Sequence, residues 1–502
     1  METNGTRATM SPTIPASTPP QTAADWLQIS RRHEQRGEVS QMFLAAQRAV
    51  QLEPASLDAR FREINCLITF GRTRAALDRL TALEPDCAQD TARLLQAGEV
   101  YARLNRSEDY SRCYARAYEL APGDRDARLN LARSLIVLGD LGRAEALLND
   151  NIREQPQDHE AWHALARLRK WSATENHVET LERLIAEAQD ARSKVALCYA
   201  LHKELEDLGE DERAMSRLQL GAKTLRGTLS YRVENDTAIM TAIAKTFPAE
   251  RIRGQTTAGR GSGAIFVIGL PRSGTTMVDR ILSMHPTVES LGELRDLTYA
   301  VTTSGGRLDT SPRLPGSRPD PAEIGNCYMD AVSTYRGDRP FFVDKAPMNF
   351  LYAGLIRLAL PGARIVLLRR NPMDSCLAIY KTLFREGSPF ACDLEDLGRY
   401  YVAWHKLAEH WTVALGDTML TVEYESLVRK QEPETRRMLN YCGLDWNPAC
   451  LDFHLNTSPT ATASAAQVRQ PLYSSSIGRW KKHARELEPL ARILRVAGIA
   501  ID

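Results

Sequence analysis

A glycine-bounded turn after a short apolar run carries the clearest chemistry in this sequence. The apolar run spans residues 265–268, and a helical pattern begins directly after the turn. The turn and the start of the helix read Gly269-Leu270-Pro271-Arg272-Ser273-Gly274-Thr275-Thr276. Glycines at both ends let the backbone wrap closely around an anion, and the free N–H groups of a helix start favour negative charge. The segment therefore predicts a strand, a phosphate-binding loop and a helix.

A second apolar strand, residues 363–368, ends in Arg369-Arg370. The first loop has the G-x-x-x-x-G spacing of nucleoside triphosphatases, but Thr275 stands where such an enzyme needs a lysine. A triphosphatase also uses an Asp at the end of the second strand to organise magnesium. Paired arginines suit a second phosphate group instead of a metal. The two strands together predict a site for a ligand with two phosphate groups and no metal.

These two motifs, in this order, resemble the sulfotransferases that use 3′-phosphoadenosine 5′-phosphosulfate as donor. The loop from Pro271 to Thr276 resembles their 5′-phosphosulfate loop, and Arg370-Asn371-Pro372-Met373-Asp374 resembles their 3′-phosphate strand. The resemblance implies that this donor is the co-substrate and that Arg272 meets the phosphosulfate. One departure is that the family carries a Ser eight residues after the 3′-phosphate arginine. This chain has Ala378 there, with Ser375 three residues earlier.

Sulfuryl transfer to a hydroxyl needs a base, donors to the bridging oxygen and cations around the sulfuryl oxygens. His285-Pro286 followed by Gly292-Glu293 resembles the protein-tyrosine sulfotransferase branch of the family. That resemblance implies Glu293 as the base, Lys345 on the sulfuryl group and bridging oxygen, and Ser464 as its partner. Glu289 is the alternative base, and a purely structural Glu293, paired with Arg295 or Arg280, is the other interpretation.

A C-terminal stretch, residues 467–480, resembles the segment that covers the nucleotide in this family. Within it, Tyr473 has the aromatic face to stack on adenine, and Arg469 or Arg479 has the charge to reach the phosphates. Tyr400, Tyr401, Trp404 and Trp411 lie at helical spacing and are predicted to be core.

A repeat occupies the first half of the chain. Gly37, Gly71, Asn105 and Gly139 recur every 34 residues, and a proline follows each of them by 17, 14, 17 and 17 residues. Helical stripes flank these positions, so each unit reads as helix, turn, helix, with the proline closing it. The period resembles tetratricopeptide repeats, which stack into a solenoid with a concave face.

Four segments follow from these patterns: a disordered leader over 1–22, a repeat solenoid over 23–225, a connecting helix and linker over 226–262, and a sulfotransferase domain over 263–502. The Gly/Arg stretch 247–263 is interpreted as a solvated linker, with contact to the cofactor as the alternative. The loop 304–321 is expected on the surface beside the active site. The fold class is an all-α solenoid followed by a three-layer α/β, P-loop-like domain with a parallel sheet.

Charge, hydrophobicity and cysteine content limit the other classes of function that this protein could have. The net charge of +1 gives no indication of nucleic-acid binding, and no apolar run approaches the length of a membrane span. Nine scattered cysteines without C-x-x-C spacing indicate buried thiols in a reducing, cytoplasmic protein.

We therefore expect a sulfotransferase that acts on a hydroxyl of a peptide, including peptidyl tyrosine, a carbohydrate or a small metabolite. A protein partner is expected on the concave face of the repeats. The alternatives are a P-loop kinase-like enzyme and a repeat scaffold with an inactive nucleotide-binding domain.

Overall fold

The computed structural model describes residues 21–253, 259–303, 320–384, 387–460, 462, 465 and 467–502. Most of the predicted leader and most of the loop 304–321 therefore lie outside the described residues. The chain divides into two compact units, Met1–Thr69 and Phe70–Asp502. The division falls inside the repeats and not near residue 225, so most of the repeats belong to the same compact unit as the α/β domain.

Over its described residues, 21–69, the first unit contains three helices: α1 (Ala23–Gln35), α2 (Val39–Leu52) and α3 (Leu57–Thr69). Thr22 caps α1, because its side chain accepts from the N–H of Asp25 while the Asp25 carboxylate accepts from the N–H of Thr22. Small and apolar residues on facing stripes form its cores, among them Leu27, Ala49 and Ala59.

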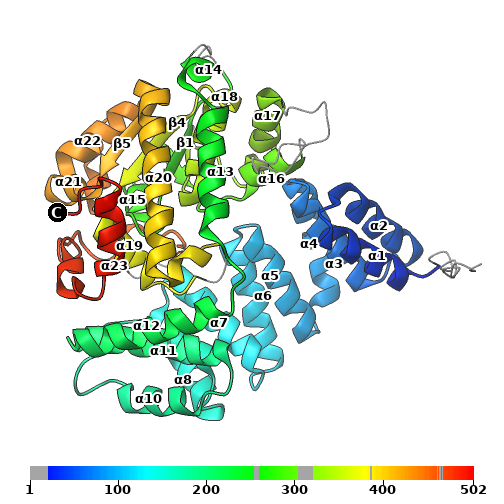
Figure 1. Ribbon diagram of the computed structural model, residues 1–502. Coiled ribbons are helices and arrows are strands. Elements are labelled where there is room, and N and C mark those ends of the chain that lie inside the picture. Colours follow the sequence, from blue (N-terminus) through cyan, green and yellow to red (C-terminus); the bar gives the residue numbers. More distant parts are fainter. Residues whose placement is uncertain are drawn as a thin grey trace, which may run out of the picture. The chain divides into compact units, whose positions relative to one another are not determined.

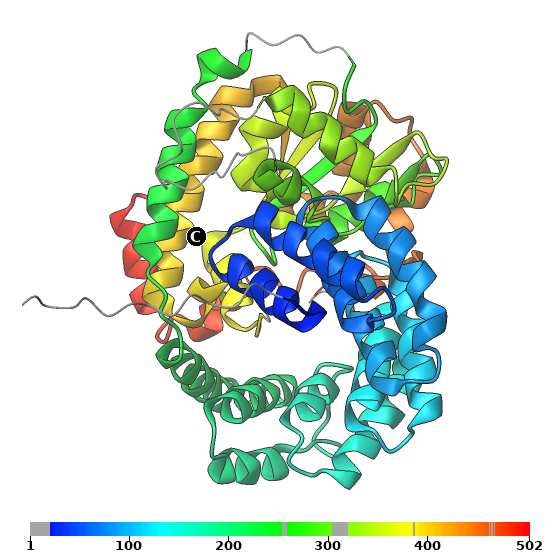
Figure 2. The ribbon, with the colours of Figure 1, turned by 90° about the vertical axis from the view of Figure 1, so that its right-hand side faces the viewer.

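Nine helices at the start of the second unit form a helical array. They are α4 (Thr73–Cys87), α5 (Thr91–Arg103), α6 (Ser107–Leu120), α7 (Arg125–Leu138), α8 (Leu141–Glu154), α9 (His159–Ala166), α10 (Val178–Glu187), α11 (Ala191–Asp207) and α12 (Asp211–Gly227). Figure 2 shows α5 to α12, cyan to green, as a curved row of helices. The helix–turn–helix prediction is confirmed.

The turn positions predicted from the 34-residue period all adopt a left-handed backbone. Their φ angles are 69° at Gly37, 67° at Gly71, 53° at Asn105 and 95° at Gly139. Three of the four prolines follow a helix as predicted, but Pro85 lies inside α4, two residues before its end. The prediction that a proline closes each unit is wrong there, because α4 continues past Pro85 to Cys87.

A parallel five-stranded sheet forms the centre of the α/β domain. Its strands are β1 (Ala264–Gly269), β2 (Val288–Ser290), β3 (Phe341–Asp344), β4 (Arg364–Arg369) and β5 (Met419–Glu423), in the order β2-β3-β1-β4-β5. Every residue of β1 is buried, as expected for a central parallel strand covered on both faces. Because all strands are parallel, their carboxyl ends meet at one edge of the sheet.

Helices cover both faces of this sheet, so the three-layer prediction is confirmed. The α-helices are α13 (Val233–Thr246), α14 (Ala249–Arg253), α15 (Thr275–Ser283), α16 (Asp296–Thr303), α17 (Pro321–Val332), α18 (Ala353–Ala359), α19 (Pro372–Tyr380), α20 (Leu394–Leu415), α21 (Tyr424–Arg429), α22 (Gln431–Cys442) and α23 (Glu488–Val496). Short 3₁₀ helices are η1 (Pro347–Tyr352), η2 (Pro389–Cys392), η3 (Gly416–Thr418), η4 (Pro448–Leu455), η5 (Gln467–Arg469) and η6 (Arg479–His483). In Figure 1, α13 and α20 lie side by side in front of the strands.

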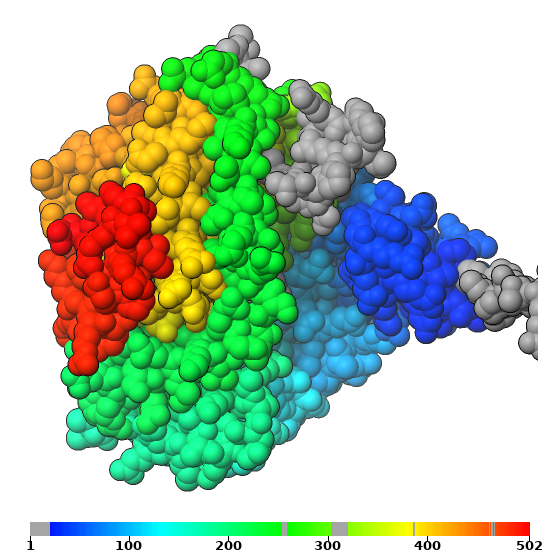
Figure 3. Space-filling model, viewed as in Figure 1, coloured from blue at the N-terminus to red at the C-terminus, as the bar shows by residue number. Residues whose placement is uncertain are grey.

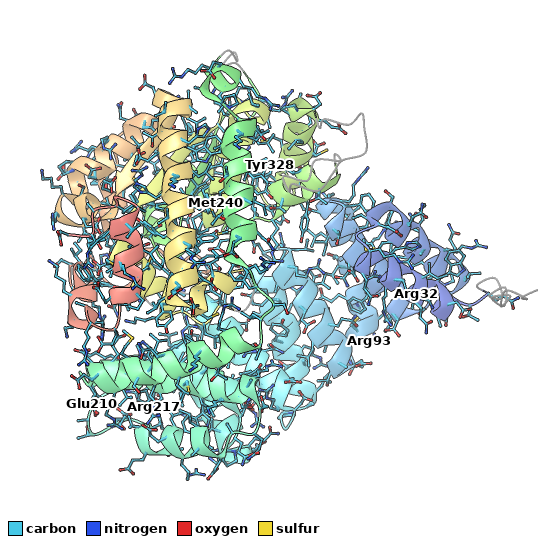
Figure 4. All side chains as sticks on the ribbon, in the orientation of Figure 1. Arg32, Arg93, Glu210, Arg217, Met240 and Tyr328 are labelled. Atoms are coloured by element: carbon cyan, nitrogen blue, oxygen red, sulfur yellow. The ribbon has the colours of Figure 1, made fainter. Side chains whose placement is uncertain are left out.

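The side-chain alternation of β1 divides the interior into two cores. Ile265 and Val267 pack into one core with α15 and α22, whereas Phe266 and Ile268 pack into the other with α18 and α20. The second core also contains Met240 of α13 and Tyr328 of α17, both labelled in Figure 4. Its aromatic centre on α20 confirms the predicted core residues Tyr400, Tyr401, Trp404 and Trp411.

The described parts of the segment interpreted as a solvated linker, residues 247–253 and 259–263, include buried residues that contact the domain. Phe247 and Ile252 are buried, and the carbonyl of Phe247 lies 2.8 Å from Nε2 of His410 on α20. On the face drawn in Figure 3, α13 lies along α20, and α23 lies on the other side of α20. Arg251, Arg253 and Arg260 donate to carbonyls of Thr246, Val413 and Ala359. These three arginines therefore bond to backbone carbonyls of the protein itself.

The last repeats share a core with the α/β domain. Tyr199 of α11 and Leu218 of α12 belong to the same apolar cluster as Phe266 of β1. Beside this cluster, Glu206 of α11 bonds to Nζ of Lys381 and lies 3.0 Å from an Arg479 nitrogen. Burial opposes the charge on Glu206, but Lys381 and the neighbouring cations lower its pKa to about 2.

This half-buried ion pair predicts how the free energy of unfolding depends on pH. Because the folded pKa of Glu206, about 2, lies below its ordinary value of 4.5, the stabilisation is complete above about pH 4.5 and is lost as the pH falls towards 2. We expect Glu206→Gln to lower the free energy of unfolding at pH 7 by roughly 3 kcal/mol. The difference from wild type should shrink between pH 5 and pH 3, measured by urea unfolding.

The control is Glu187→Gln, which removes the exposed partner of Arg183 on α10. Exposed pairs contribute little, so this variant should stay within about 0.5 kcal/mol of wild type at every pH. A Glu206→Gln penalty that does not change with pH would contradict the assignment.

Candidate active site

The loop between β1 and α15 has the strained backbone of an anion cradle. Gly269, Arg272 and Gly274 have φ angles of 153°, 67° and 107°. A Cβ on Gly274 would lie 2.7 Å from the Tyr424 ring, so only glycine fits there. The Ser273 hydroxyl donates to the carbonyl of Leu270 at 2.8 Å and closes the loop. The first turn of α15 directs its N–H groups towards this loop.

Arg272 and Arg370 are brought together as the sequence predicted. Arg370 donates from Nη1 to the carbonyl of Arg272 at 3.0 Å and from Nη2 to the carbonyl of Ser476 at 2.9 Å. Burial, followed by the charges of Arg167 and Arg370, lowers the pKa of Arg272 to about 10. The shift therefore comes first from burial and second from neighbouring like charges, and an anion bound there would offset both.

The guanidinium of Arg370 lies over the ring of Tyr424. It lies 4.7 Å from the centre of the Tyr424 ring, and the Tyr424 hydroxyl is 2.8 Å from Oγ of Ser476. Within the described part of the chain, the buried Nε of Arg370 has no hydrogen-bond partner. An unsatisfied buried donor costs free energy unless a ligand accepts from it.

The C-terminal segment expected to cover the nucleotide is fixed over α19. The Asp374 carboxylate accepts from the N–H of Gly478 at 2.6 Å and from the N–H of Trp480 at 3.0 Å. Arg479, between them, extends to Glu206. Tyr473 is 36% exposed, and burial raises its pKa beside Tyr424, Arg272 and Arg370. Arg469, the alternative phosphate ligand, instead donates to the carbonyl of Val137 at 3.0 Å.

Ala378, where the sulfotransferase pattern has a serine, lies one helical turn before a cation, Lys381. Lys381 caps the end of α19, three residues beyond Ala378, and bonds to Glu206. Burial lowers its pKa, and Arg479 and Arg272 add to this effect. Ser375 is buried inside α19. The positions around the predicted 3′-phosphate site therefore hold Arg370, Lys381 and Arg479.

Glu293 and Lys345, 52 residues apart in the sequence, form an ion pair at the carboxyl edge of the sheet. Lys345 follows β3 directly, and its side chain is 1% exposed, whereas that of Glu293 is 47% exposed. The backbone of the Glu293 loop runs beside the end of β3. The N–H of Leu291 donates to the carbonyl of Val343, and the N–H of Lys345 donates to the carbonyl of Gly292, both at 2.9 Å.

Two buried carboxyl groups near this pair were not predicted. Burial raises the pKa of Asp279 on α15, although the charge of Lys345 and the Ser290 hydroxyl lower it. Burial raises the pKa of Asp344 to about 8, with the Tyr328 hydroxyl donating to its Oδ2 at 2.8 Å. An aspartate among the apolar residues of a helix, as at Asp279, is the signal that sequence reasoning could have used.

The alternative carboxylate, Glu289, has a different environment. It accepts from the N–H of Gly337 at 2.9 Å and lies 3.7 Å from Nε of Arg336. Arg280, one expected partner of a structural Glu293, instead donates to Oδ1 of Asn456 at 2.6 Å. Ser464 lies outside the described residues, so its role stays a prediction.

Three features of the described residues bear on metal ions, membranes and thiol chemistry. Among them, no group of three or more His, Cys, Asp or Glu side chains is arranged to hold a metal ion. In the same part of the chain, no helix combines the length and apolarity needed to cross a bilayer. Eight of the nine cysteines are buried, and Cys327 is half-buried.

Comparison with known proteins finds relatives over much of the chain. The chain is 27% identical over 395 residues to an uncharacterized protein of Aquifex aeolicus (strain VF5), covering 76% of this chain and about half, 51%, of that protein. A putative protein-tyrosine sulfotransferase of Caenorhabditis briggsae is 26% identical over 253 residues, 47% of this chain and 88% of that protein. The sulfotransferase domain of the Synechococcus PCC 7002 olefin synthase aligns at 15% identity and a TM-score of 0.35, over 49% of this chain and 99% of that domain.

Family models match one range in each half of the chain. Residues 112–168 match the Tetratricopeptide repeat, and residues 264–448 match the Sulfotransferase family. The second range begins at β1 and includes the loop, Glu293, Lys345 and Arg370. The chain thus carries tetratricopeptide repeats followed by a domain of the sulfotransferase family.

Proposed function

We propose that this protein transfers a sulfuryl group from 3′-phosphoadenosine 5′-phosphosulfate to an acceptor hydroxyl. The observation that carries the proposal is the pair of Glu293 and Lys345 beside an anion-binding loop, with arginine at the end of β4. A base, a cation and a phosphate cradle meet at one edge of the sheet, where parallel α/β domains bind ligands.

The residues around the loop fit this donor. The backbone of Pro271, Ser273, Gly274, Thr275 and Thr276 and the side chain of Arg272 would hold the 5′-phosphosulfate. Arg370, whose Nε has no hydrogen-bond partner among the described residues, would hold the 3′-phosphate. Lys381 and Arg479 add charge where Ala378 lacks a hydroxyl, and Tyr473 offers its ring to the adenine.

The chemistry would be an in-line transfer. Glu293 takes the proton of the acceptor hydroxyl as the new bond from oxygen to sulfur forms. Lys345 stabilises the negative charge that develops on the bridging oxygen as the bond from sulfur to that oxygen breaks. Arg272 neutralises the sulfuryl and phosphate oxygens, and Ser464 is proposed to assist Lys345. None of these steps calls for a metal.

Acceptor classes remain peptidyl tyrosine, carbohydrate hydroxyls and small-metabolite hydroxyls. The name of the Caenorhabditis briggsae relative supports the tyrosyl acceptor. We further propose that the protein acts in the cytoplasm and that the concave face of the repeats binds a protein partner.

The direct test is incubation with radiolabelled donor, without added metal, and a panel of one tyrosyl peptide, one phenol and one oligosaccharide. Label transferred to any acceptor supports the function and identifies the acceptor class. Transfer of phosphate from labelled ATP with magnesium, without sulfuryl transfer, would favour the kinase alternative.

Donor binding can be measured separately from turnover. At about 100 times its Kd, 3′-phosphoadenosine 5′-phosphate should stabilise the protein by roughly 2.7 kcal/mol without magnesium, raising the Tm more than ATP with magnesium does. Arg370→Ala should lose most of this shift. Arg364→Ala is the control, because Arg364 lies exposed at the opposite end of the same strand. Equal shifts by both nucleotides would argue against a dedicated 3′-phosphate site.

The base assignment predicts a selective loss of turnover. Glu293→Gln keeps the size of the side chain but cannot accept a proton, so kcat should fall about 10²- to 10⁴-fold while affinity for 3′-phosphoadenosine 5′-phosphate changes little. Glu289→Gln is the matched control and should keep near-normal kcat, since its contacts are with Arg336 and Gly337. A large loss of kcat in Glu289→Gln, with near-normal kcat in Glu293→Gln, would show that Glu289 is the base.

A further inference from the structure

One repeat differs from its neighbours at the turn. Three of the four turn positions spaced by 34 residues are glycines, whereas the third is Asn105, and all four have positive φ. Glycine adopts this conformation without a Cβ penalty, and asparagine is tolerated there at some cost. The side chain of Asn105 is therefore a departure from the repeat that the turn itself does not require.

That side chain reaches the loop that carries Glu293. Nδ2 of Asn105 donates to the carbonyl of Glu293 at 2.9 Å and lies 3.4 Å from the carbonyl of Leu291. Gly292, between them, has a φ of 71°, and a Cβ added to it would lie 3.7 Å from the same Nδ2. The amide thus lies along the backbone of three consecutive loop residues.

A second repeat residue holds the far end of this loop. The Thr73 hydroxyl, at the start of α4, donates to Oδ1 of Asp296 at 2.7 Å, and both side chains are buried. On its other side, the loop is bound to the end of β3 through Val343 and Lys345. The loop 291–296 is therefore held between the sheet and the repeats.

We propose that Asn105 is a positioning residue for Glu293, so that the repeat array forms part of the active site; this rests on the proposed sulfuryl transfer. The Glu293 side chain is 47% exposed, and Lys345 is its ion-pair partner. The position of the Glu293 carboxylate relative to an acceptor hydroxyl consequently depends on the position of the Glu293 backbone. Displacement of a catalytic group by about 1 Å can cost on the order of 10²-fold in rate.

Two variants separate the side-chain role from the turn. Asn105→Gly restores the residue found at the sister turns and accepts the positive φ, but removes the amide donor. Asn105→Asp keeps the shape but directs a carboxylate at two carbonyl oxygens. The control is Asn176→Gly, since Asn176 also donates to two backbone carbonyls, those of Ser172 and Ala173 in its own loop.

The measurements are kcat and KM with whichever panel acceptor is sulfated, affinity for 3′-phosphoadenosine 5′-phosphate, Tm, and hydrogen exchange over 291–296. We expect Asn105→Gly to lower kcat roughly 10- to 100-fold, with nucleotide affinity within about 2-fold and faster exchange confined to this loop. Asn105→Asp should lose more kcat, and Asn176→Gly should behave as wild type.

Three results would overturn the inference, and they are distinguishable. Wild-type protein that sulfates no acceptor overturns the proposed function and this inference with it. Active wild type with full kcat and unchanged loop exchange in Asn105→Gly overturns the positioning role alone. Equal losses of Tm, nucleotide affinity and kcat in Asn105→Gly would show a general structural role and also overturn it.

Discussion

The ion pair of Lys345 and Glu293 is the interaction on which the catalytic end of the domain depends. An ammonium group that is 1% exposed is costly to bury unless an anion lies beside it. The fold provides Glu293 on the solvent side and the field of Asp279 from α15. The position of Lys345 is fixed because it directly follows β3. The loop that carries Glu293 must therefore lie beside the end of that strand. The register of the sheet thereby sets the distance between the Glu293 carboxylate and the Lys345 ammonium group.

The same edge of the sheet concentrates positive charge. Arg272, Arg370, Lys381 and Arg479 lie close enough to shift the pKa values of their neighbours. Glu206, from the repeats, supplies an internal anion to two of them. Such a cluster is unfavourable by itself, since like charges repel in a partly dry site. A ligand with two phosphate groups would offset this repulsion, which is the physical argument for the proposed donor.

Repeats and catalytic domain are less separable than their sequence patterns suggest. From Phe70 onward they form one compact unit, and α11 and α12 contribute to the core beneath the sheet. The repeat turns at Asn105 and near Val137 also contact loops of the site. A repeat array elsewhere in proteins contacts mainly its own neighbours. Here its turns also contact two segments of the α/β domain, the loop that carries Glu293 and the C-terminal segment that carries Arg469.

Local patterns in the sequence determined the helix–turn–helix period, the buried strands, the glycine loop and the arginine at the end of β4. Each depends on residues close in the chain, where periodicity and backbone sterics act directly. The tertiary structure decided which distant residues meet. It joined Glu293 to Lys345, seated Glu289 against Arg336, and brought Asn105 to a loop 188 positions away. It also placed Pro85 inside a helix and buried Phe247 and Ile252, which belong to the segment interpreted as a linker. Such contacts follow from packing of whole elements, which no short-range pattern encodes.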